Sequence, residues 1–517
     1  MPVETTLFLK INRIYVHQQV HNMASLTRTY DQKKLLGQVY TPLHIVQKIL
    51  DAIGLDSPGF LGKPILDPAC GDGRFLVEVV RRIIRISPAE KLTENLLCVH
   101  GWDIDARALS LCRQALDQEL MPLGLSVPWR LSKRDALKLG KITETFDYIV
   151  GNPPYIRIQH LPEKQRTYLQ KNYLFCRSGS TDTYVAFFEL AARLLTNRGL
   201  CGFITPNSYF FSETARPLRH FFLENRNLRL ITNYGSVRVF DKTGTYAAIT
   251  IFGKQSASDF CYEMSSAQFD YPSRMISFAE LASTDLWQLS VAAPLVLAGV
   301  RLGDICQISV GITTLSDRLY LFTVLEELPG QVVRAVSRAG VEVQLEKGIL
   351  KPIIKASRLK SADEPMTEYI LFPYQKNEAG KHGILPETAL ENDFPLTYAY
   401  LKSQKGFLAR RDNGRPNAVA WYAFGRAQSL DSSFGKKIIF SPMNREPRFV
   451  FSDREDATVY SGYLIKYRGD YAKLLPLLNS QAMADYMAVA GRDFRGGWKG
   501  YSKKIVENFR IDPNRLL

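Results

Sequence analysis

Short apolar runs alternate with amphipathic stretches from residue 37 to about residue 254. The apolar runs predict β-strands at residues 64–66, 96–101, 146–150, 201–205, 228–233 and 247–252. The amphipathic stretches predict helices at residues 74–86, 106–119, 184–196 and 215–225. This alternation predicts an α/β fold with a doubly wound, mostly parallel sheet. Ligands of such sheets bind beyond the carboxyl ends of the strands.

The pattern changes on both sides of the predicted sheet. Residues 1–36 are polar and mixed, which predicts an N-terminal extension ahead of an α/β domain over residues 37–255. Residues 256–300 carry polar turns and short apolar runs, so we expect a connector there. From Leu302 onward short strands, aromatic residues and Lys or Arg interleave. We therefore predict a second domain, of mixed α+β structure, over residues 301–517.

The composition is that of a globular protein. Of the 517 residues, 46% are hydrophobic and 23% charged. No apolar run reaches the roughly 18 residues of a membrane span, and we find no secretory signal. The seven cysteines form no CxxC pair and the seven histidines are scattered. We therefore expect no disulfide framework and no metal site, and a reducing, cytoplasmic location.

The charge balance is strongly basic, with a net charge of +15. Residues 301–517 hold 32 Lys and Arg against 24 Asp and Glu, so the predicted second domain has the higher charge density. A surplus of this size attracts polyanions such as nucleic acids. The alternative is a solvated basic surface without a partner.

Two acidic residues lie at or just beyond the carboxyl ends of consecutive predicted strands, and a third lies before a polar turn in the segment that follows. Asp67 opens a turn with Gly71 and Gly73, where glycine lets the backbone approach a ligand closely. Asp103 ends the next strand, where a carboxylate can accept from ribose hydroxyls, and Asp135 can accept from an adenine amino group. The turn lacks the third glycine of the dinucleotide fingerprint, which argues against NAD. Helix or turn capping is the alternative, but three such residues favour a ligand site.

The tetrapeptide Asn152-Pro153-Pro154-Tyr155 directly follows a buried strand. Its two prolines fix the backbone and remove N–H donors, which leaves carbonyls free to accept, and the Asn152 amide adds another acceptor. Two acceptors can hold both hydrogens of an amino group that is conjugated into a ring, which frees the lone pair of its nitrogen. Tyr155 offers a flat face on which a base can stack. A tight loop after a strand is the less favoured alternative.

These segments resemble the S-adenosylmethionine-dependent amino-methyltransferases. Among them the chain most resembles the gamma class of adenine-N6 DNA methyltransferases of restriction–modification systems. The resemblance implies the class I, Rossmann-like methyltransferase fold, with S-adenosylmethionine as the cofactor and no metal. It is strong over residues 37–254 and looser over 300–517. The matching segments also include residues 37–42 (GQVYTP), 181–184 (TDTY), 202–208 (GFITPNS) and 239–245 (VFDKTGT).

The resemblance implies a role for each residue of the cofactor site. Asp103 holds the ribose with Ile104 against the adenine ring, and Asp135 accepts from the adenine amino group. One departure is Asp72, where small residues are common in the family; it either changes cofactor affinity or faces solvent. The implied cofactor residues are Thr41, Asp67, Ala69, Gly71, Gly73, Asp103, Ile104, Asp135 and Asn152.

The same resemblance makes Asn152, Pro153, Pro154 and Tyr155 the catalytic residues. The Asn152 side chain and the Pro153 carbonyl hold the target amino group, and Tyr155 and Phe240 sandwich the target base. A base inside a duplex cannot reach such a site, so it must be flipped out.

The second domain resembles the target-recognition domain of the family. Basic residues there lie among asparagines and aromatic residues, which suits contacts to phosphates and to base edges. A solvated basic face is the alternative for any single cluster. The candidate DNA-binding residues are Lys355, Arg358, Arg410, Arg411 and Arg426.

The resemblance thus implies a site-specific methyltransferase that acts on adenine N6 in double-stranded DNA, as a monomer on DNA. A cognate restriction endonuclease would be separately encoded, since 36 residues before Gly37 are too few for a nuclease domain. RNA adenine N6 and DNA cytosine N4 remain alternative targets. A protein-glutamine methyltransferase is less favoured because of the long basic second domain. A non-catalytic binding subunit is disfavoured by the intact motifs.

Overall fold

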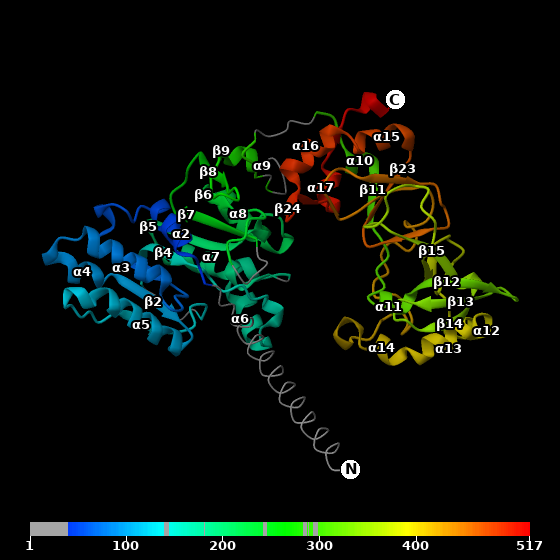
Figure 1. Ribbon diagram of the computed structural model, residues 1–517, viewed down its shortest axis with the longest axis horizontal. Helices are drawn as coiled ribbons and strands as arrows, with labels where there is room; N and C mark the ends of the chain where they lie inside the picture. Colours follow the sequence, from blue (N-terminus) through cyan, green and yellow to red (C-terminus); the bar gives the residue numbers. More distant parts are fainter. Residues whose placement is uncertain are drawn as a thin grey trace, which may run out of the picture. The chain divides into compact units, whose positions relative to one another are not determined.

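The computed structural model describes residues 40–138, 144–179, 181–240, 246–282, 287, 289–292 and 298–516 (Figure 1). The described residues form two compact units that divide between residues 293 and 294. We call them the N-terminal unit and the C-terminal unit. The predicted extension over residues 1–36 lies outside the described part of the chain.

The described part of the N-terminal unit is built on a nine-stranded sheet in the order β3-β2-β1-β4-β5-β7-β6-β8-β9. The strands β3, β2, β1, β4 and β5 run parallel to one another. Strand β7 is antiparallel to both of its neighbours, β5 and β6. Strand β8 is parallel to β6, and β9 is antiparallel to β8. The strands are β1 (Ile65–Asp67), β2 (Val99–Asp103), β3 (Arg130–Lys133), β4 (Phe146–Gly151), β5 (Leu195–Pro206), β6 (Leu228–Asn233), β7 (Ala247–Gly253), β8 (Asp259–Met264) and β9 (Ser273–Ser277). The prediction of a mostly parallel sheet is confirmed.

Helices cover both faces of this sheet because successive strand residues point to opposite sides. In β4, for example, Ile149 packs into one hydrophobic core and Val150 into the other. Helices α2, α3 and α5 contribute to the core that holds Val150, and α7 and α8 to the core that holds Ile149. The helices are α2 (Leu43–Ala52), α3 (Arg74–Ile86), α4 (Leu92–Leu96), α5 (Ala106–Leu120), α6 (Glu163–Asn172), α7 (Thr183–Leu194), α8 (Arg216–Asn225) and α9 (Phe278–Ala282). The doubly wound class I fold is thus confirmed.

One boundary of the predicted domains needs correction. We expected a connector over residues 256–300, yet β8 and β9 lie there and extend the sheet beyond β6. Phe278 of α9 and Trp287 are buried in the same core as α7. The first part of the expected connector therefore belongs to the N-terminal unit.

The C-terminal unit is a mixed α+β structure, as predicted. A six-stranded sheet has the order β14-β13-β12-β16-β15-β22, and a four-stranded antiparallel sheet has the order β11-β23-β19-β21. The strands are β10 (Val300–Arg301), β11 (Cys306–Val310), β12 (Leu321–Leu328), β13 (Val332–Ser337), β14 (Glu342–Glu346), β15 (Leu350–Lys355), β16 (Tyr369–Leu371), β17 (Tyr374–Lys376), β18 (His382–Ile384), β19 (Lys437–Phe440), β20 (Met443–Asn444), β21 (Phe449–Ser452), β22 (Thr458–Tyr460), β23 (Tyr463–Tyr467), β24 (Arg492–Phe494), β25 (Trp498–Gly500) and β26 (Arg510–Ile511). Its largest core gathers aromatic side chains such as Tyr320, Phe372 and Phe424.

Short helices complete the C-terminal unit. They are α10 (Leu302–Ile305), α11 (Asp317–Tyr320), α12 (Glu387–Asp393), α13 (Pro395–Ser403), α14 (Lys405–Ala409), α15 (Tyr471–Leu478), α16 (Gln481–Ala490) and α17 (Lys503–Glu507). Across both units, no helix within the described residues has the length and apolar character needed to cross a membrane.

Candidate active site

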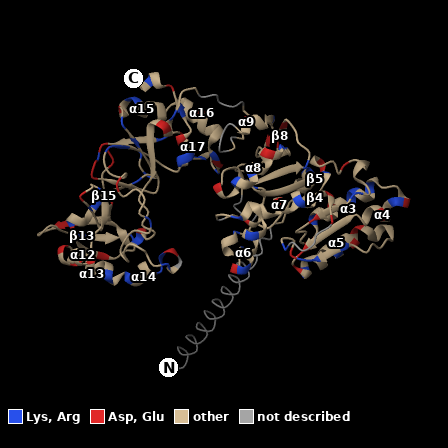
Figure 2. Cartoon of the chain, turned by 180° about the vertical axis from the view of Figure 1, so that it is seen from behind, with Lys and Arg blue, Asp and Glu red and all other residues tan. Residues whose placement is uncertain are grey.

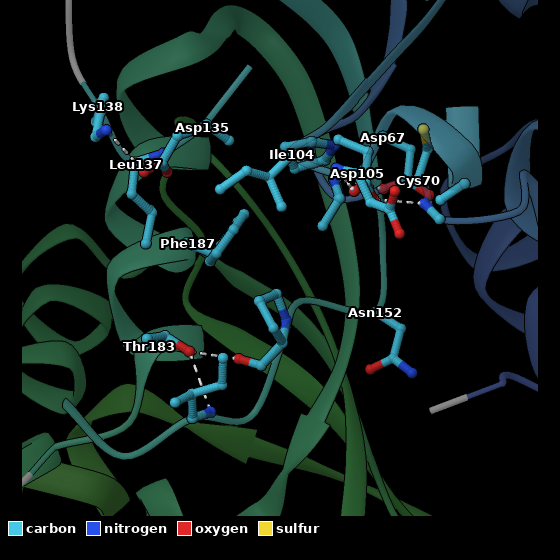
Figure 3. Close-up of a pocket in the computed structure, with 18 of the residues that line it drawn as sticks. Asp67, Cys70, Ile104, Asp105, Asp135, Leu137, Lys138, Asn152, Thr183 and Phe187 are labelled. Atoms are coloured by element: carbon cyan, nitrogen blue, oxygen red, sulfur yellow. Dashed lines mark hydrogen bonds and ion pairs between the residues drawn. The ribbon is translucent and has the colours of Figure 1, made fainter. Parts of the chain in front are cut away.

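A cavity of about 1130 Å³ lies at the carboxyl ends of the central parallel strands (Figure 3). The segments that follow β1, β2, β3 and β4 line it, together with residues of α6 and α7. Its volume is sufficient for a ligand of cofactor size. The predicted cofactor residues on its wall are Thr41, Asp67, Ala69, Gly71, Asp103, Ile104, Asp135 and Asn152.

The glycine turn between β1 and α3 shapes one side of this cavity. Gly71 and Gly73 have φ of 54° and 90°, a region that favours glycine. Gly73 is the N-cap of α3, and a Cβ there would lie 2.6 Å from the Cys112 sulfur on α5. Unlike Gly71, Gly73 does not line the cavity. Gly73 lets α3 begin close to α5 and shapes the turn, and its role toward the cofactor stays a prediction.

We expect Gly73→Ala to lower the free energy of unfolding by about 2–4 kcal/mol, since it adds left-handed backbone strain to a steric clash. Urea unfolding would measure the loss. Gly59→Ala is the matched control, because a Cβ there meets nothing closer than 3.9 Å. Adding Cys112→Ala to Gly73→Ala removes the clashing sulfur. The double variant should therefore recover only the part of the lost unfolding free energy that comes from the steric clash. A Gly73→Ala protein as stable as the control would contradict this account of the turn.

Asp103 at the end of β2 joins the glycine turn to the next loop. Its Oδ2 accepts from the backbone N–H of Gly71 at 2.9 Å, and its Oδ1 accepts from that of Asp105 at 2.8 Å. A carboxylate has about four acceptor positions, so Asp103 can still accept from ligand hydroxyls. The next residue, Ile104, is 59% exposed, and it presents an apolar surface at the cavity. Together they offer a hydroxyl acceptor next to an apolar contact.

Asp67 at the end of β1 is a buried carboxyl on the cavity wall. It is 2% exposed, and its Oδ1 accepts from the Ala69 N–H at 3.0 Å. Burial, helped by the nearby charges of Asp103 and Asp72, raises the pKa of Asp67 to about 8 against the lowering effect of the Ala69 N–H. The cavity wall thus holds a carboxyl that a cationic ligand would ionise.

A third carboxylate lies on the side of the cavity formed after β3. Asp135 Oδ1 accepts from the Leu137 N–H at 3.1 Å, and the Lys138 ammonium is 3.9 Å from the other oxygen. Figure 3 shows Asp135, Ile104 and Phe187 around the same part of the cavity. Phe187 comes from α7, and we did not anticipate it. Its ring gives this part an aromatic wall beside a carboxylate, which suits a purine with an amino group.

The tetrapeptide after β4 is held by hydrogen bonds from distant segments. The Asn152 Nδ2 donates to the Thr41 Oγ1 at 3.1 Å, and the Tyr155 hydroxyl donates to the Asn152 Oδ1. The Thr183 hydroxyl at the start of α7 donates to the Pro154 carbonyl at 2.6 Å. Thr183 therefore anchors the loop through Pro154. The Asn152 oxygen and the Pro153 carbonyl are the acceptors expected to hold an amino group.

Tyr155 and Phe240 lie close together, but they do not form an open slot. Their ring centroids are 6.5 Å apart with the planes tilted by 60°, and Phe240 is 2% exposed. Burial raises the pKa of Tyr155 well above 10, so its hydroxyl stays protonated. The structure thus brings together the two rings predicted to sandwich a base. A base could enter between them only if the rings separated.

Other cavity residues were not anticipated as site residues. The Arg74 guanidinium stacks on the Tyr40 ring at 4.5 Å, and both residues line the cavity. His160 and Tyr168, around α6, line another part. Tyr40 lies within the matching segment of residues 37–42 and Arg74 directly follows Gly73, so their positions in the sequence could have identified them. The α6 residues lie in a polar segment whose sequence carries no such signal.

The candidate DNA-binding residues of the C-terminal unit differ in their surroundings. Figure 2 shows basic and acidic residues interspersed over this unit. Arg410 is exposed and stacks on the Phe407 ring at 4.7 Å, and Arg426 forms a two-armed ion pair with Asp412 at 3.2 and 3.3 Å. Burial and the charge of the nearby Arg358 lower the pKa of Lys355. These cations lie at or near the surface.

Arg411 differs in its surroundings, and its role in DNA binding stays a prediction. Its guanidinium donates to the carbonyls of Ala423 at 2.9 Å and Trp421 at 2.8 Å, and its Nε donates to that of Leu408 at 3.0 Å. A longer contact of 3.4 Å reaches the Thr314 carbonyl. Because backbone acceptors engage this guanidinium from several sides, Arg411 holds loops of the C-terminal unit together.

Comparison with known proteins shows what the chain is similar to. Residues 98–240, which include the tetrapeptide, match the family model of the Eco57I restriction-modification methylase. The chain is 25% identical to the type II methyltransferase M.BanIII of Aneurinibacillus aneurinilyticus, over 93% of this chain and 90% of that protein. It is 22% identical to the type II restriction enzyme and methyltransferase RM.Eco57I of Escherichia coli, over 92% of this chain but only 56% of that protein.

A solved structure shares the fold. The type IIL restriction-modification enzyme MmeI, in complex with DNA, superposes with a TM-score of 0.67 at 14% sequence identity. The match covers 92% of this chain and 68% of that chain. A class I methyltransferase fold with these relatives implies S-adenosylmethionine as the cofactor. In sequence the chain is thus similar to restriction–modification methyltransferases, and residues 98–240 match the Eco57I restriction-modification methylase model.

Proposed function

We propose that this protein is the modification enzyme of a restriction–modification system and methylates N6 of adenine in double-stranded DNA. The observation that carries the proposal is the position of Asn152. Its side chain lies on the cavity wall and bears an acceptor oxygen beside the Pro153 backbone. One residue thus borders both the cofactor cavity and the acceptors for a planar amino group.

The cavity fits the cofactor. Three carboxylates surround it at the ends of β1, β2 and β3, and the ionisable Asp67 suits the cationic methionine end. Asp103 would accept from the ribose hydroxyls, and Asp135 from the adenine amino group beside Ile104 and Phe187. Thr41, Ala69 and Gly71 would complete the wall. S-adenosylmethionine supplies the sulfonium methyl group, which no side chain of the protein can provide.

The tetrapeptide would prepare the target nitrogen for attack. The Asn152 oxygen and the Pro153 carbonyl accept the two amino hydrogens, which draws the nitrogen out of conjugation and exposes its lone pair. Tyr155 and Phe240 hold the base on its faces. These contacts act through positioning and fixed hydrogen bonds. The product ammonium is acidic, so its proton can pass to water without a strong base.

Duplex DNA as the substrate is supported by charge and by the relatives. The C-terminal unit carries the denser positive charge, and MmeI was solved with DNA. Phosphate contacts from Lys355, Arg358, Arg410 and Arg426 would offset the cost of flipping a base, which is roughly a few kcal/mol. Adenine rather than cytosine is favoured by Asn at the first tetrapeptide position, since Ser is commoner there among cytosine-N4 enzymes. We further propose that the enzyme acts as a monomer and that its cognate endonuclease is separately encoded.

Transfer of a labelled methyl group tests the proposal. The enzyme is incubated with labelled S-adenosylmethionine and, in parallel, with duplex DNA of varied sequence, RNA or protein. We expect label in duplex DNA, recovered as N6-methyladenine after nucleoside analysis. Recovery as N4-methylcytosine would move the target to cytosine. Label in RNA or protein alone would overturn the proposal.

Base capture gives a separate prediction about Tyr155. We expect Tyr155→Ala to weaken capture of the flipped base by about tenfold, because stacking on an aromatic ring contributes roughly 1–3 kcal/mol per base. A fluorescent base analogue at the target position reports capture as an increase in emission. Tyr271→Ala, at a partly exposed position that does not line the cavity, is the control. Unchanged emission with Tyr155→Ala would argue against stacking on this ring.

A further inference from the structure

Thr41 lies at the start of the N-terminal unit and meets the catalytic loop through one hydrogen bond. It is 3% exposed, two residues before α2 begins. Its Oγ1 accepts from the Asn152 Nδ2 at 3.1 Å, across 111 residues of sequence. Both side chains also border the cavity. The bond can therefore act on the orientation of Asn152 as well as on the shape of the cofactor cavity.

The two ends of the Asn152 amide have opposite hydrogen-bonding character. To hold an amino group, Asn152 must present its oxygen, because the oxygen accepts and the nitrogen only donates. With the oxygen facing the substrate, the amide nitrogen faces Thr41, where a buried N–H without an acceptor would be unfavourable. The Thr41 hydroxyl oxygen is the acceptor placed at that position.

The contacts in the structure already correspond to this orientation. The Tyr155 hydroxyl donates to the Asn152 Oδ1, in the position that an amino hydrogen of the target would take, and it also lies 3.2 Å from the Ile204 carbonyl. When a base arrives, its amino group can replace the Tyr155 hydroxyl at this oxygen. The bond from Asn152 to Thr41 need not change.

We propose that Thr41 is a positioning residue that holds the Asn152 amide with its oxygen toward the target amino group. This inference rests on the proposed function, in which Asn152 binds that group. It also gives Thr41 a role distinct from lining the cofactor cavity. The substitution that separates the two roles keeps the shape of the side chain and removes only its hydroxyl.

Thr41→Val is that substitution, with Thr41→Ser as the variant that keeps the hydroxyl. We expect Val to lower the single-turnover methyl-transfer rate by about 10- to 100-fold at saturating S-adenosylmethionine and DNA, as expected for one unsatisfied buried donor. Ser should restore most of the rate. The Kd for S-adenosylmethionine, measured by calorimetry in both variants, sets the concentration needed for saturation and reports that the site is folded.

Two outcomes would overturn the inference. One is a Val variant with an unchanged single-turnover rate at saturation, whatever its affinity for the cofactor. The other is a Ser variant as slow as Val. If Val proves unstable, Thr41→Ala compared with Thr41→Ser applies the same criterion. Failure of the proposed function would look different, because Asn152→Ala would then remain active.

Discussion

Asn152→Ala is expected to lower the single-turnover rate of methyl transfer by at least about 1000-fold while the Kd for S-adenosylmethionine changes only severalfold. Removal of one preorganised hydrogen-bonding partner typically costs about 100- to 1000-fold. Here the loss of rate should lie at the upper end, because Asn152 also helps to orient Tyr155 by accepting from the Tyr155 hydroxyl. The remaining Pro153 carbonyl cannot hold both hydrogens of the amino group.

The control for this variant is Asn225→Ala at the end of α8. That side chain is exposed and donates only to the Phe221 carbonyl within its own helix. Its transfer rate should match that of the unaltered enzyme. Rates would be followed with labelled cofactor and duplex DNA in a rapid-quench experiment. An Asn152→Ala protein that still transfers methyl groups at a comparable rate would remove the chemical basis of the proposal.

The second large effect concerns Asp67 and pH. Its pKa of about 8 means that most of this carboxyl is protonated near pH 7 in the empty enzyme. A bound cation favours the ionised form, so cofactor binding should release a proton. We therefore expect the affinity for S-adenosylmethionine to rise with pH by up to about tenfold per unit below pH 8, and to level off above it.

Asp67→Asn isolates this contribution. The cofactor's own α-amino group titrates near pH 7.7–8.0, but it does so with both proteins, so the difference between them reports the carboxyl. The variant should bind weakly and lose the rise with pH. Asp56→Asn, at an exposed position outside the cavity, should behave like the unaltered enzyme. Parallel pH profiles for all three proteins would contradict the assignment.

The same carboxyl should make the empty enzyme less stable as pH rises, which is opposite to its effect on the affinity for the cofactor. Since folding raises its pKa, the protonated form stabilises the fold, fully below about pH 4 and progressively less as pH rises through 8. At pH 9 the empty Asp67→Asn protein should therefore melt at a higher temperature than the unaltered enzyme. Cofactor at saturating concentration should reverse that order, as differential scanning calorimetry can show.

The sheet could be predicted where strands are buried on both faces. The segments that form β1, β4 and β7 are rich in buried apolar residues, so the hydrophobic pattern alone located them. Strand β3 was missed because it is polar and largely exposed. Strands β8 and β9 were missed because few of their residues are fully buried, so the sequence of this segment resembles a linker.

The residues of the candidate site also divide into those that the sequence predicts and those that depend on packing. Asp67, Asp103 and Asn152 each stand at or directly after a strand end, so their convergence follows from the parallel sheet. Phe187 and the bond between Thr41 and Asn152 depend on how α7 and the start of the unit pack, which local sequence does not encode. Charge alone could not show that the Arg411 guanidinium is engaged by backbone carbonyls.

The two units have separate hydrophobic cores, and this has an evolutionary consequence. A substitution that repacks Phe372 or Phe424 in one core leaves the packing around Phe188 in the other untouched. If the C-terminal unit selects the DNA sequence, this unit can accumulate substitutions, or be exchanged for the corresponding unit of a relative. The N-terminal unit would meanwhile keep its residues for methyl transfer. New sequence specificities could then arise without passing through an inactive ancestor.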